Sequence, residues 1–527
     1  MDALRSWVRG RTGPARYALA CGLGLLFALA QAPYSLWPLL AIAFPGLFWL
    51  LEGCASAPRP HRAGFATASA FGFGACALGL YWVAFAFLVQ AEDFAWMIPV
   101  LVPGLWAYLS IYSGLAGLVV VALLVAEPAM GPVRRVALFA GAWTLAELLR
   151  GEVFGGFPWN LTAQASLGWL PLAQGLGVLG PYGLGLVLTF LFTLPAVAGP
   201  RRWPLAVGPG GLALLAALGA LALVPTDAPD PAARLVVAQP SIPQRDKLDP
   251  GKREANLLRT LQMTAEAAGR SSGPTYALWP ENAYPYLAEQ PGVGAGLADL
   301  LPDHVTLVTG SVRAWEDGRH YRFANAVEVF GPTRDGEKPH LATYDKHHLV
   351  PFGEFLPLSG LMQRLGLASL SPVGAGGFEP GPGPRTLAVG PSPFAPLVCY
   401  ESVFPGEMYP ASSRPDWLAL VTNDAWFGDG AGPKQHLAIG RMRAIETGLP
   451  MARAANTGIS AVIDARGRVL EALPLYEPGV IAASLPAPLP PTLYASLREL
   501  PFAALLLVCT LGASGLGLAT RRSSGHA

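Results

Sequence analysis

Charged residues are scarce in this sequence. Asp, Glu, Lys and Arg make up 13% of its 527 residues, about half the share found in typical soluble domains, whereas hydrophobic residues make up 52%. The high hydrophobicity excludes an intrinsically disordered chain. The net charge of +1 provides no overall basic field, which leaves a nucleic-acid partner without support.

The shortage of charge is concentrated in the first 225 residues. They contain 11 arginines, seven acidic residues and no lysine, whereas residues 226–527 contain the other 53 charged residues. Eight apolar segments approach the length of a membrane-spanning helix, which is about 20 residues. They cover roughly 17–30, 36–51, 64–90, 97–125, 136–149, 176–197, 204–224 and 500–519. We therefore predict a membrane domain with seven transmembrane helices over 1–225, and a C-terminal transmembrane helix with a cytoplasmic tail over 496–527.

The distribution of arginine predicts the orientation of these helices. Arginine clusters occur in alternate loops, as the positive-inside rule requires, so both termini are expected in the cytoplasm and residues 226–495 outside it. The clusters are Arg5, Arg9, Arg11 and Arg16 before the first segment, Arg59 and Arg62 after the second, Arg134 and Arg135 after the fourth, Arg201 and Arg202 after the sixth, and Arg521 and Arg522 after the eighth. A cleaved signal peptide ending near Ala30 is an alternative that would leave this orientation unchanged.

Residues 226–495 have the pattern of an α/β domain. Short β-rich runs occur at 234–238, 276–279, 305–309, 326–330, 341–344, 395–398, 418–422 and 459–463, with helical patterns at about 251–268 and 435–448. A long loop at 355–384 contains an apolar segment, 361–370. We interpret the loop as a candidate lid and the segment as an arm that touches the bilayer, the alternative being a helix packed on its own domain.

Cysteine is also scarce, and Cys399 is the only one in the exported domain, so that domain has no internal disulfide. Cys399, Glu281 and Lys346 each follow a strand-like run, where a side chain is exposed while its backbone is held. Together they could supply a thiolate nucleophile, a general base and an oxyanion stabiliser, with the backbone N–H of Tyr400 as a second donor. Spacing leaves open the alternative of a core cysteine, a capping glutamate and a solvated lysine.

Several motifs resemble those of a known family. Trp279-Pro280-Glu281-Asn282-Ala283 resembles the glutamate motif of the nitrilase superfamily, and the segment from Tyr344 to Glu354 resembles its lysine motif in the form typical of apolipoprotein N-acyltransferases. Further matches are Cys399-Tyr400-Glu401, Asn423-Asp424-Ala425-Trp426-Phe427-Gly428, Gln435-His436, Arg443-Ala444-Ile445-Glu446, Asn456-Thr457-Gly458 and, in the membrane domain, Gly156-Phe157-Pro158-Trp159. Leu449 and Ala455 depart from the pattern, since arginine and threonine are common there.

The resemblance implies a fold and roles for the matching residues. The exported domain is expected to be a nitrilase-like α-β-β-α sandwich. Glu281 is implied as general base, Lys346 as oxyanion stabiliser and Cys399 as nucleophile. Glu354, Tyr400 and Glu401 match supporting or substrate-binding positions, with ordinary ion pairing as the alternative for the two glutamates.

The resemblance also implies a reaction and a location. The enzyme would transfer an acyl chain from a phospholipid such as phosphatidylethanolamine, through a thioester on Cys399, to the α-amino group of a diacylglyceryl-cysteine at the N-terminus of an apolipoprotein. It would lie in a bacterial inner membrane as a monomer with its catalytic domain in the periplasm, and no cofactor is expected. No metal is expected either, because His347 and His348 lie in a strand-edge motif without a Cys or carboxylate partner at a recognised ligand spacing, and adjacent residues on a strand point to opposite faces.

Two other functions remain open from the sequence. A membrane-anchored amidase or nitrilase would use the same three residues, although one span would suffice as its anchor. A transporter would suit eight spans, but few charged residues lie within them and no half-to-half repeat is evident. Glu147, near the outer end of the fifth segment, is either functional or within reach of water.

Overall fold

The computed structural model describes residues 2–199, 202–224, 233–271, 273–288, 290, 292–318, 320–356 and 377–512. The chain divides into two compact units. A helical unit comprises Met1–Pro225, Gly430–Ala438 and Pro491–Ala527, and an α/β unit comprises Thr226–Asp429 and Ile439–Pro490. The division near residue 225 agrees with the change in composition there.

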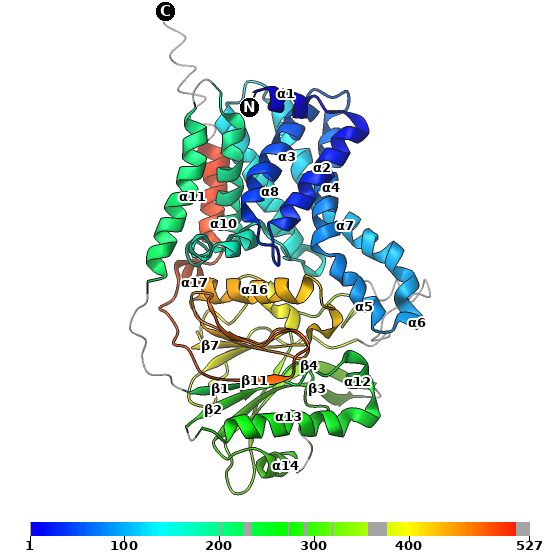
Figure 1. Cartoon of the computed structure of the whole chain (residues 1–527), viewed down its shortest axis with the longest axis vertical. Helices are drawn as coiled ribbons and strands as arrows, with labels where there is room; N and C mark the ends of the chain where they lie inside the picture. The colour runs from blue at the N-terminus through cyan, green and yellow to red at the C-terminus, as the bar shows by residue number, and fades with distance from the viewer. Residues whose placement is uncertain are drawn as a thin grey trace, which may run out of the picture. The chain divides into compact units, whose positions relative to one another are not determined.

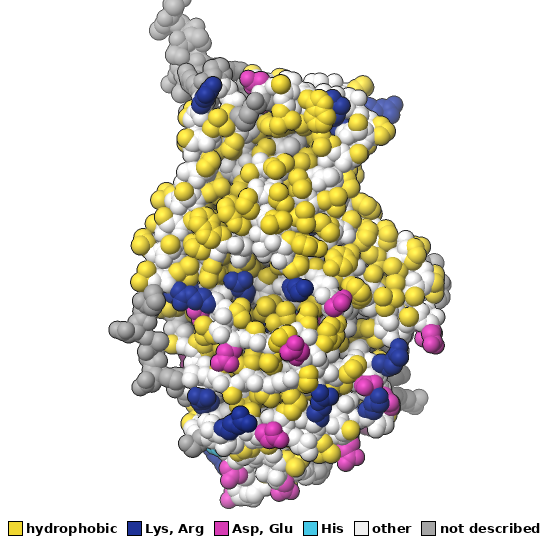
Figure 2. Space-filling view, in the orientation of Figure 1, with side chains coloured by type: hydrophobic (Ala, Val, Ile, Leu, Met, Phe, Trp, Pro, Cys, Tyr) yellow, Lys and Arg dark blue, Asp and Glu magenta, His cyan; other side chains and the backbone are white. Residues whose placement is uncertain are grey.

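The helical unit consists of apolar helices, several of which begin with proline in the first turn, where its missing N–H costs no hydrogen bond. Its α-helices are α1 (Asp2–Arg9), α2 (Gly13–Leu29), α3 (Leu40–Cys54), α4 (Pro60–Gly79), α5 (Ala84–Leu88), α6 (Ala91–Phe94), α7 (Ile98–Ala126), α8 (Pro132–Glu152), α9 (Leu170–Ala173), α10 (Leu176–Thr193), α11 (Trp203–Ala222), α17 (Leu493–Leu497) and α18 (Leu500–Leu507). Hydrophobic side chains cover much of the visible face of this unit (Figure 2).

Four helices of the described chain are long and apolar enough to cross a membrane, and up to six if each of two bent pairs forms one span. The four cover Trp37–Cys54, Ala91–Ala126, Leu176–Val197 and Trp203–Ala222. The predicted third segment is bent by 56° between α4 and the helices after it, and the eighth appears as the short apolar helix Leu500–Thr510. The chain therefore has the helices of a membrane protein, while the count of eight spans stays a prediction.

Small residues bring α4 and α7 into close contact. A Cβ atom added to Gly117 would lie 2.6 Å from the Gly64 carbonyl oxygen, and one added to Gly64 would lie 2.9 Å from the Gly117 carbonyl oxygen. Such backbone approach is typical of helix pairs in membranes, where dispersion forces rather than the hydrophobic effect hold helices together.

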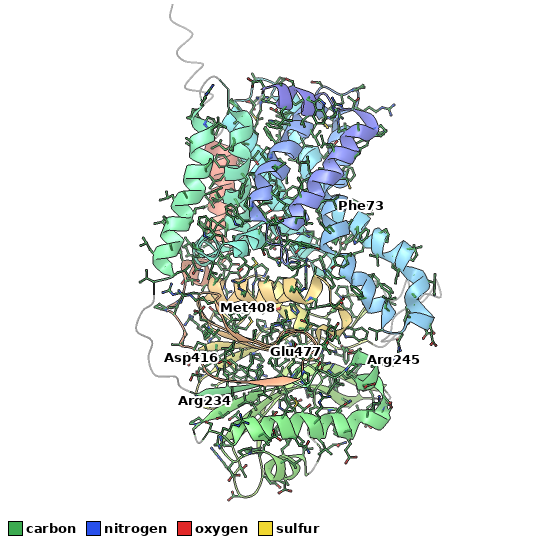
Figure 3. All side chains as sticks on the ribbon, in the orientation of Figure 1. Phe73, Arg234, Arg245, Met408, Asp416 and Glu477 are labelled. Atoms are coloured by element: carbon green, nitrogen blue, oxygen red, sulfur yellow. The ribbon has the colours of Figure 1, made fainter. Side chains whose placement is uncertain are left out.

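The α/β unit contains two sheets. The six-stranded sheet has the order β11-β1-β2-β3-β4-β5 and the five-stranded sheet has the order β10-β9-β8-β7-β6. The strands are β1 (Arg234–Gln239), β2 (Thr275–Leu278), β3 (Val305–Asp317), β4 (His320–Phe330), β5 (His340–Asp345), β6 (Phe394–Val398), β7 (Trp417–Thr422), β8 (Met451–Ala455), β9 (Ala461–Ile463), β10 (Val469–Ala472) and β11 (Gly479–Ser484). Figure 3 labels Arg234 at the start of β1 and Glu477 just before β11, its antiparallel partner.

The two faces of β1 show how the layers are built. Leu235 and Val237 belong to the core that also contains Phe394 and Trp417 of the five-stranded sheet, so this core lies between the sheets. Val236 and the other outward residues pack against α13 (Arg253–Ala268) and α14 (Val293–Leu300), which cover the outer face of the six-stranded sheet (Figure 1). Successive side chains of a strand point to opposite faces, so alternate residues of β1 belong to the core between the sheets and to the core beneath α13 and α14.

The second half of α16 (Gly432–Thr447) belongs to the α/β unit and covers the five-stranded sheet. A Cβ atom on Gly440 would lie 3.1 Å from the Met451 sulfur in β8, and Arg441 Nε donates to the Gly467 carbonyl at 2.8 Å. The unit is therefore layered as helices, sheet, sheet and helix. The predicted α/β sandwich is confirmed, and the predicted export of this domain stays a prediction.

Candidate functional site

The three predicted catalytic residues follow the ends of three strands of the α/β unit. Glu281 comes three residues after β2, Lys346 directly follows β5, and Cys399 directly follows β6. β2 and β5 belong to the six-stranded sheet and β6 to the five-stranded sheet. Both sheets thus contribute to one site.

Lys346 lies between two carboxylates. Its Nζ atom is 2.9 Å from Glu354 Oε1 and 2.8 Å from Oε2, and it is 3.8 Å from Glu281 Oε1. The Asn325 amide donates to both carboxylates, at 2.7 Å each. All four side chains are buried, so the charges are held in a medium where their mutual attraction is strong.

Cys399 occupies a constrained turn. Its φ of +50° is in the left-handed region, which a side chain disfavours and which costs of order 1–3 kcal/mol. The residue begins a short 3-10 helix, Cys399–Val403, whose first turn is held by the hydrogen bond from Val398 N to Glu401 Oε2 at 2.7 Å. Strain of this kind at a predicted nucleophile indicates that the surrounding structure fixes its position.

The electrostatics of the site keep the cysteine protonated at rest. Burial raises the pKa of the Cys399 thiol, and the negative charge of Glu281 raises it further, whereas Lys346 lowers it. Burial also raises the pKa of Glu281, against the effect of Lys346. For Lys346, burial opposes the charge, but Glu354 and Glu281 outweigh it and raise the pKa. Lys346 is therefore a permanent ammonium, and Glu281 is a better base than an ordinary carboxylate.

Glu401 ties the lysine-bearing segment to the cysteine-bearing turn. Its Oε1 atom accepts from the Tyr344 hydroxyl at 2.7 Å and from the His347 backbone N–H at 2.8 Å, while Oε2 accepts from Val398 N. His347 Nδ1 also lies 2.6 Å from Glu401 Oε1. Burial opposes the ionised form of Glu401, but the histidine outweighs it, and its pKa is lowered.

Two residues of the site escaped the sequence reasoning. Asn325 lies in β4, and Lys247 lies in α12 (Gln244–Leu248), where its Nζ atom donates to the Glu281 backbone carbonyl at 2.6 Å. The only sequence feature that could have indicated Asn325 is its polar side chain directly before the β-rich run 326–330, in the middle of β4. Lys247 carried no such feature, because its approach to Glu281 is purely tertiary.

Tyr400 and the two departures from the family pattern lie in packed surroundings. The Tyr400 ring packs edge-on against Phe404, with ring centroids 5.1 Å apart. Leu449 and Ala455 are fully buried, and the backbone N–H of Ala455 donates to Ser460 Oγ at 2.9 Å. The residues of this segment are thus accommodated by local packing.

The geometric premise used for the histidine pair was wrong. His347 and His348 follow β5 in a bend rather than continuing the strand, and their rings approach to 5.3 Å. With Glu407 they form a group of potential metal ligands whose atoms lie within 4.8 Å of one another. His348 Nδ1 is 2.9 Å from Glu407 Oε2, which is also the geometry of an ion pair.

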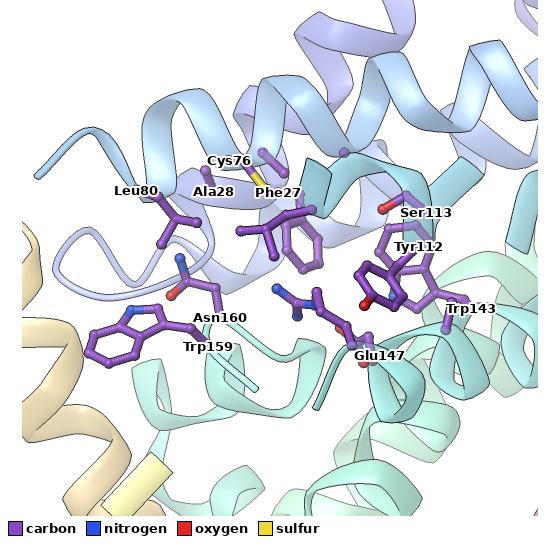
Figure 4. Close-up of a pocket in the computed structure, with 15 residues that line it drawn as sticks. Phe27, Ala28, Cys76, Leu80, Tyr112, Ser113, Trp143, Glu147, Trp159 and Asn160 are labelled. Atoms are coloured by element: carbon purple, nitrogen blue, oxygen red, sulfur yellow. The ribbon is translucent and has the colours of Figure 1, made fainter. Parts of the chain in front are cut away.

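The helical unit has a pocket of its own, lined mostly by apolar and aromatic side chains together with Ser113, Glu147, Arg150 and Asn160 (Figure 4). Glu147 is buried, and its Oε1 atom accepts from Thr162 N at 2.8 Å and from Thr162 Oγ1 at 2.9 Å.

Two of the matching motifs meet in the same unit. Trp159 donates its indole N–H to Gln435 Oε1 at 2.7 Å, and Trp82 donates to the same atom at 3.0 Å. The Gln435 amide in turn donates to the Gly79 carbonyl at 3.0 Å. Gln435 is thereby held by several segments of the helical unit. The predicted arm, 361–370, and most of the predicted lid lie outside the described residues.

Comparisons with known proteins agree with the motifs. Residues 23–194 match the family model described as the apolipoprotein N-acyltransferase N-terminal domain, and residues 235–489 match the carbon-nitrogen hydrolase model. A relative from Rhodopseudomonas palustris (strain ATCC BAA-98 / CGA009), named apolipoprotein N-acyltransferase, is 40% identical over 508 residues, 93% of each chain. Relatives of the same name from Bradyrhizobium diazoefficiens and Sinorhizobium fredii are 41% identical, over 94% of each chain, and 36% identical, over 99% of this chain and all of the relative.

The chain therefore belongs to the apolipoprotein N-acyltransferase family. The family and the carbon-nitrogen hydrolase domain predicted from the motifs are confirmed, and the apolar helices fit a membrane enzyme. The roles of the individual site residues stay predictions.

Proposed function

We propose that this protein N-acylates apolipoproteins in two steps through a thioester on Cys399. The observation that carries the proposal is the buried arrangement of Lys346 between Glu281 and Glu354. Cys399 is held in a strained turn, close enough to Glu281 and Lys346 for both charges to act on its thiol. The arrangement combines a nucleophile, a base and a fixed ammonium in one site.

In the first step, Glu281 accepts the thiol proton as the Cys399 sulfur attacks the ester carbonyl carbon of a phospholipid. The Lys346 ammonium stabilises the oxyanion of the tetrahedral intermediate. The ester C–O bond then breaks, and the lysophospholipid oxygen leaves with the proton from Glu281. The sulfur–carbon bond of an acyl thioester remains.

In the second step, the α-amino group of a diacylglyceryl-cysteine attacks the thioester carbonyl. The C–S bond breaks, an amide forms, and Glu281 returns the proton lost by the amine to the departing thiolate. The same groups serve both steps, because each step passes through a tetrahedral oxyanion at one position. The product is a triacylated lipoprotein, made by an inner-membrane enzyme with its catalytic domain in the periplasm.

Mass spectrometry of the protein tests the first step. Purified protein incubated with phosphatidylethanolamine should gain one acyl mass on the peptide that contains Cys399. The matched control is Cys509→Ser, which removes a half-buried cysteine of the helical unit and should keep the adduct. Wild-type protein that never acquires the adduct, in either detergent or lipid, would contradict the proposal.

The second step is tested on the isolated acyl-enzyme. Addition of a peptide with an N-terminal diacylglyceryl-cysteine should remove the adduct and give an N-acylated peptide in equal amount. Release of free fatty acid without peptide acylation would favour the hydrolase alternative instead.

A further inference from the structure

A basic pocket adjoins Glu281 in the α/β unit. It contains about 400 Å³ of empty space, counted to its open mouth, and Pro280 and Asn282, the two neighbours of Glu281, both line it. No carboxylate side chain lines it in the described part of the chain. Its polar lining consists of Lys247, Arg253, Asn256, Asn282 and Asn456.

The two cations of this pocket have spare hydrogen-bond donors. Lys247 donates to the Glu281 carbonyl at 2.6 Å, which leaves other ammonium protons available. Arg253 is exposed, and among the described residues its guanidinium makes no ion pair. Burial lowers the pKa of Lys247 to about 8, so a bound anion would compensate for the water that this ammonium has lost.

Arg253 and Asn256 both belong to the first turn of the 16-residue helix α13. This helix follows directly on a 3-10 turn, Pro250–Lys252, whose start is capped by Asp249 Oδ1, which accepts from Gly251 N at 2.9 Å, and the Arg253 N–H donates to the Pro250 carbonyl. The positive charge of the pocket therefore comes from its two side-chain cations, which favour an anion.

We propose that this pocket binds the phosphodiester of the phospholipid donor and thereby directs an ester carbonyl of that lipid to Cys399. A phosphodiester carries one negative charge and several acceptor oxygens, and only the glycerol backbone separates it from the acyl esters. Lys247 acts electrostatically on both Glu281 and Cys399, so the pocket is close to the reacting groups. The inference rests on the proposed function and names the part of the substrate that the enzyme recognises.

Two donors with the same acyl chains test the proposal. The rate of adduct formation on Cys399 is measured with phosphatidylethanolamine and with diacylglycerol, which lacks the phosphate. Wild-type protein should prefer the phospholipid. Arg253→Gln and Lys247→Gln should each lower the ratio of the two rates about 10-fold or more, as expected for one charge-assisted hydrogen bond.

The matched control is Lys252→Gln. Lys252 precedes Arg253, is half-exposed, pairs with Asp246 at 2.7 Å and does not line the pocket, so this variant removes the same charge nearby and should keep the wild-type ratio. Thermal unfolding of each variant shows that the fold is retained. A ratio unchanged in both pocket variants, or equally lowered in the control, would overturn the proposal.

A binding experiment separates the pocket from the reaction. Cys399→Ala protein is titrated with glycerophosphoethanolamine and with inorganic phosphate, and the same titrations are repeated with Arg253→Gln added. Binding of the lipid headgroup analogue that is weakened by Arg253→Gln supports the proposal even if wild-type protein forms no adduct with any donor. Binding of inorganic phosphate only, or no binding at all, would overturn it.

Discussion

Glu281 shares its surroundings with three other charged side chains, Lys346, Glu354 and Lys247, so its ionisation depends on its neighbours. Burial raises its pKa, while Lys346 and the Asn325 amide lower it. A base with a raised pKa takes a thiol proton more readily than an ordinary carboxylate does. The arrangement predicts how the acylation rate responds to pH.

We expect the rate of Cys399 acylation to fall as the pH falls through the raised pKa of Glu281. The decline should begin at a higher pH than for an ordinary carboxyl group, because protonated Glu281 cannot accept the thiol proton. Asn325→Ala removes a hydrogen bond that favours the ionised form and should move this acidic limb to still higher pH. The measurement is the adduct rate between pH 4 and 8, and a limb that does not move in Asn325→Ala would contradict this assignment.

His347 makes the stability of the α/β unit depend on pH. Burial opposes its charge, but hydrogen bonds and attraction to Glu401 and Glu407 outweigh burial and raise its pKa from 6.5 to about 9. A raised pKa means that the stabilisation is fully present below pH 6.5 and is lost as the pH rises through about 9. The difference between the ordinary pKa of 6.5 and the raised pKa of about 9 corresponds to at most about 3 kcal/mol in the free energy of unfolding.

Thermal unfolding between pH 6 and 10 tests this dependence. Wild-type protein should lose stability over that range, and His347→Gln should be less stable at pH 6 but change less with pH. His61→Gln, at an exposed position of the helical unit, serves as the control and should follow the wild-type curve. Parallel curves for wild-type protein and His347→Gln would show that the histidine is not the titrating group.

At the scale of elements, β3 positions the glutamate-bearing loop by close backbone contact. A Cβ atom on Gly310 would lie 2.5 Å from the Glu281 Cα atom and 2.6 Å from Asn282 N, and both are backbone atoms that cannot move aside cheaply. The absence of a side chain at Gly310 therefore lets the loop after β2 approach the neighbouring strand.

Gly310→Ala should displace Glu281 and lower the acylation rate at least about 10-fold, since small misplacements of catalytic groups are costly. The matched control is Gly296→Ala in α14, where nothing lies within 4 Å of an added Cβ atom. That change should leave the rate unaltered and raise helix stability by up to about 1 kcal/mol. The adduct rate and the melting temperature are measured for both variants, and equal rates would show that the contact at Gly310 is not needed.

At the scale of the whole molecule, the distribution of charge predicts which unit meets water and on which side. The arginine clusters predict that both termini lie in the cytoplasm and residues 226–495 outside it. In a cysteine-free background, Glu316→Cys on the exposed end of β3 should react with an impermeant maleimide in intact spheroplasts, whereas Arg59→Cys should react only after lysis. The reverse pattern would show the opposite orientation.

Some features of this protein follow from the sequence alone because they depend on local composition and spacing. Low charge and long apolar segments predicted a membrane unit, strand-like runs predicted the α/β unit, and the motifs around Glu281, Lys346 and Cys399 predicted the family. Long apolar segments and the alternation of apolar residues along strands can be recognised within a short stretch of sequence.

Other features were decided by the tertiary structure, because they join residues far apart in the chain. Asn325 bridges two carboxylates, Glu401 links the segment after β5 to the turn after β6, and Lys247 reaches the Glu281 carbonyl from α12. No local pattern encodes such contacts, and His347 and His348 are brought together by a bend that follows the end of β5. The sequence determined which residues could do the chemistry. The packing of the two sheets determined which of these side chains lie close enough in the buried interior to act on one another's charge.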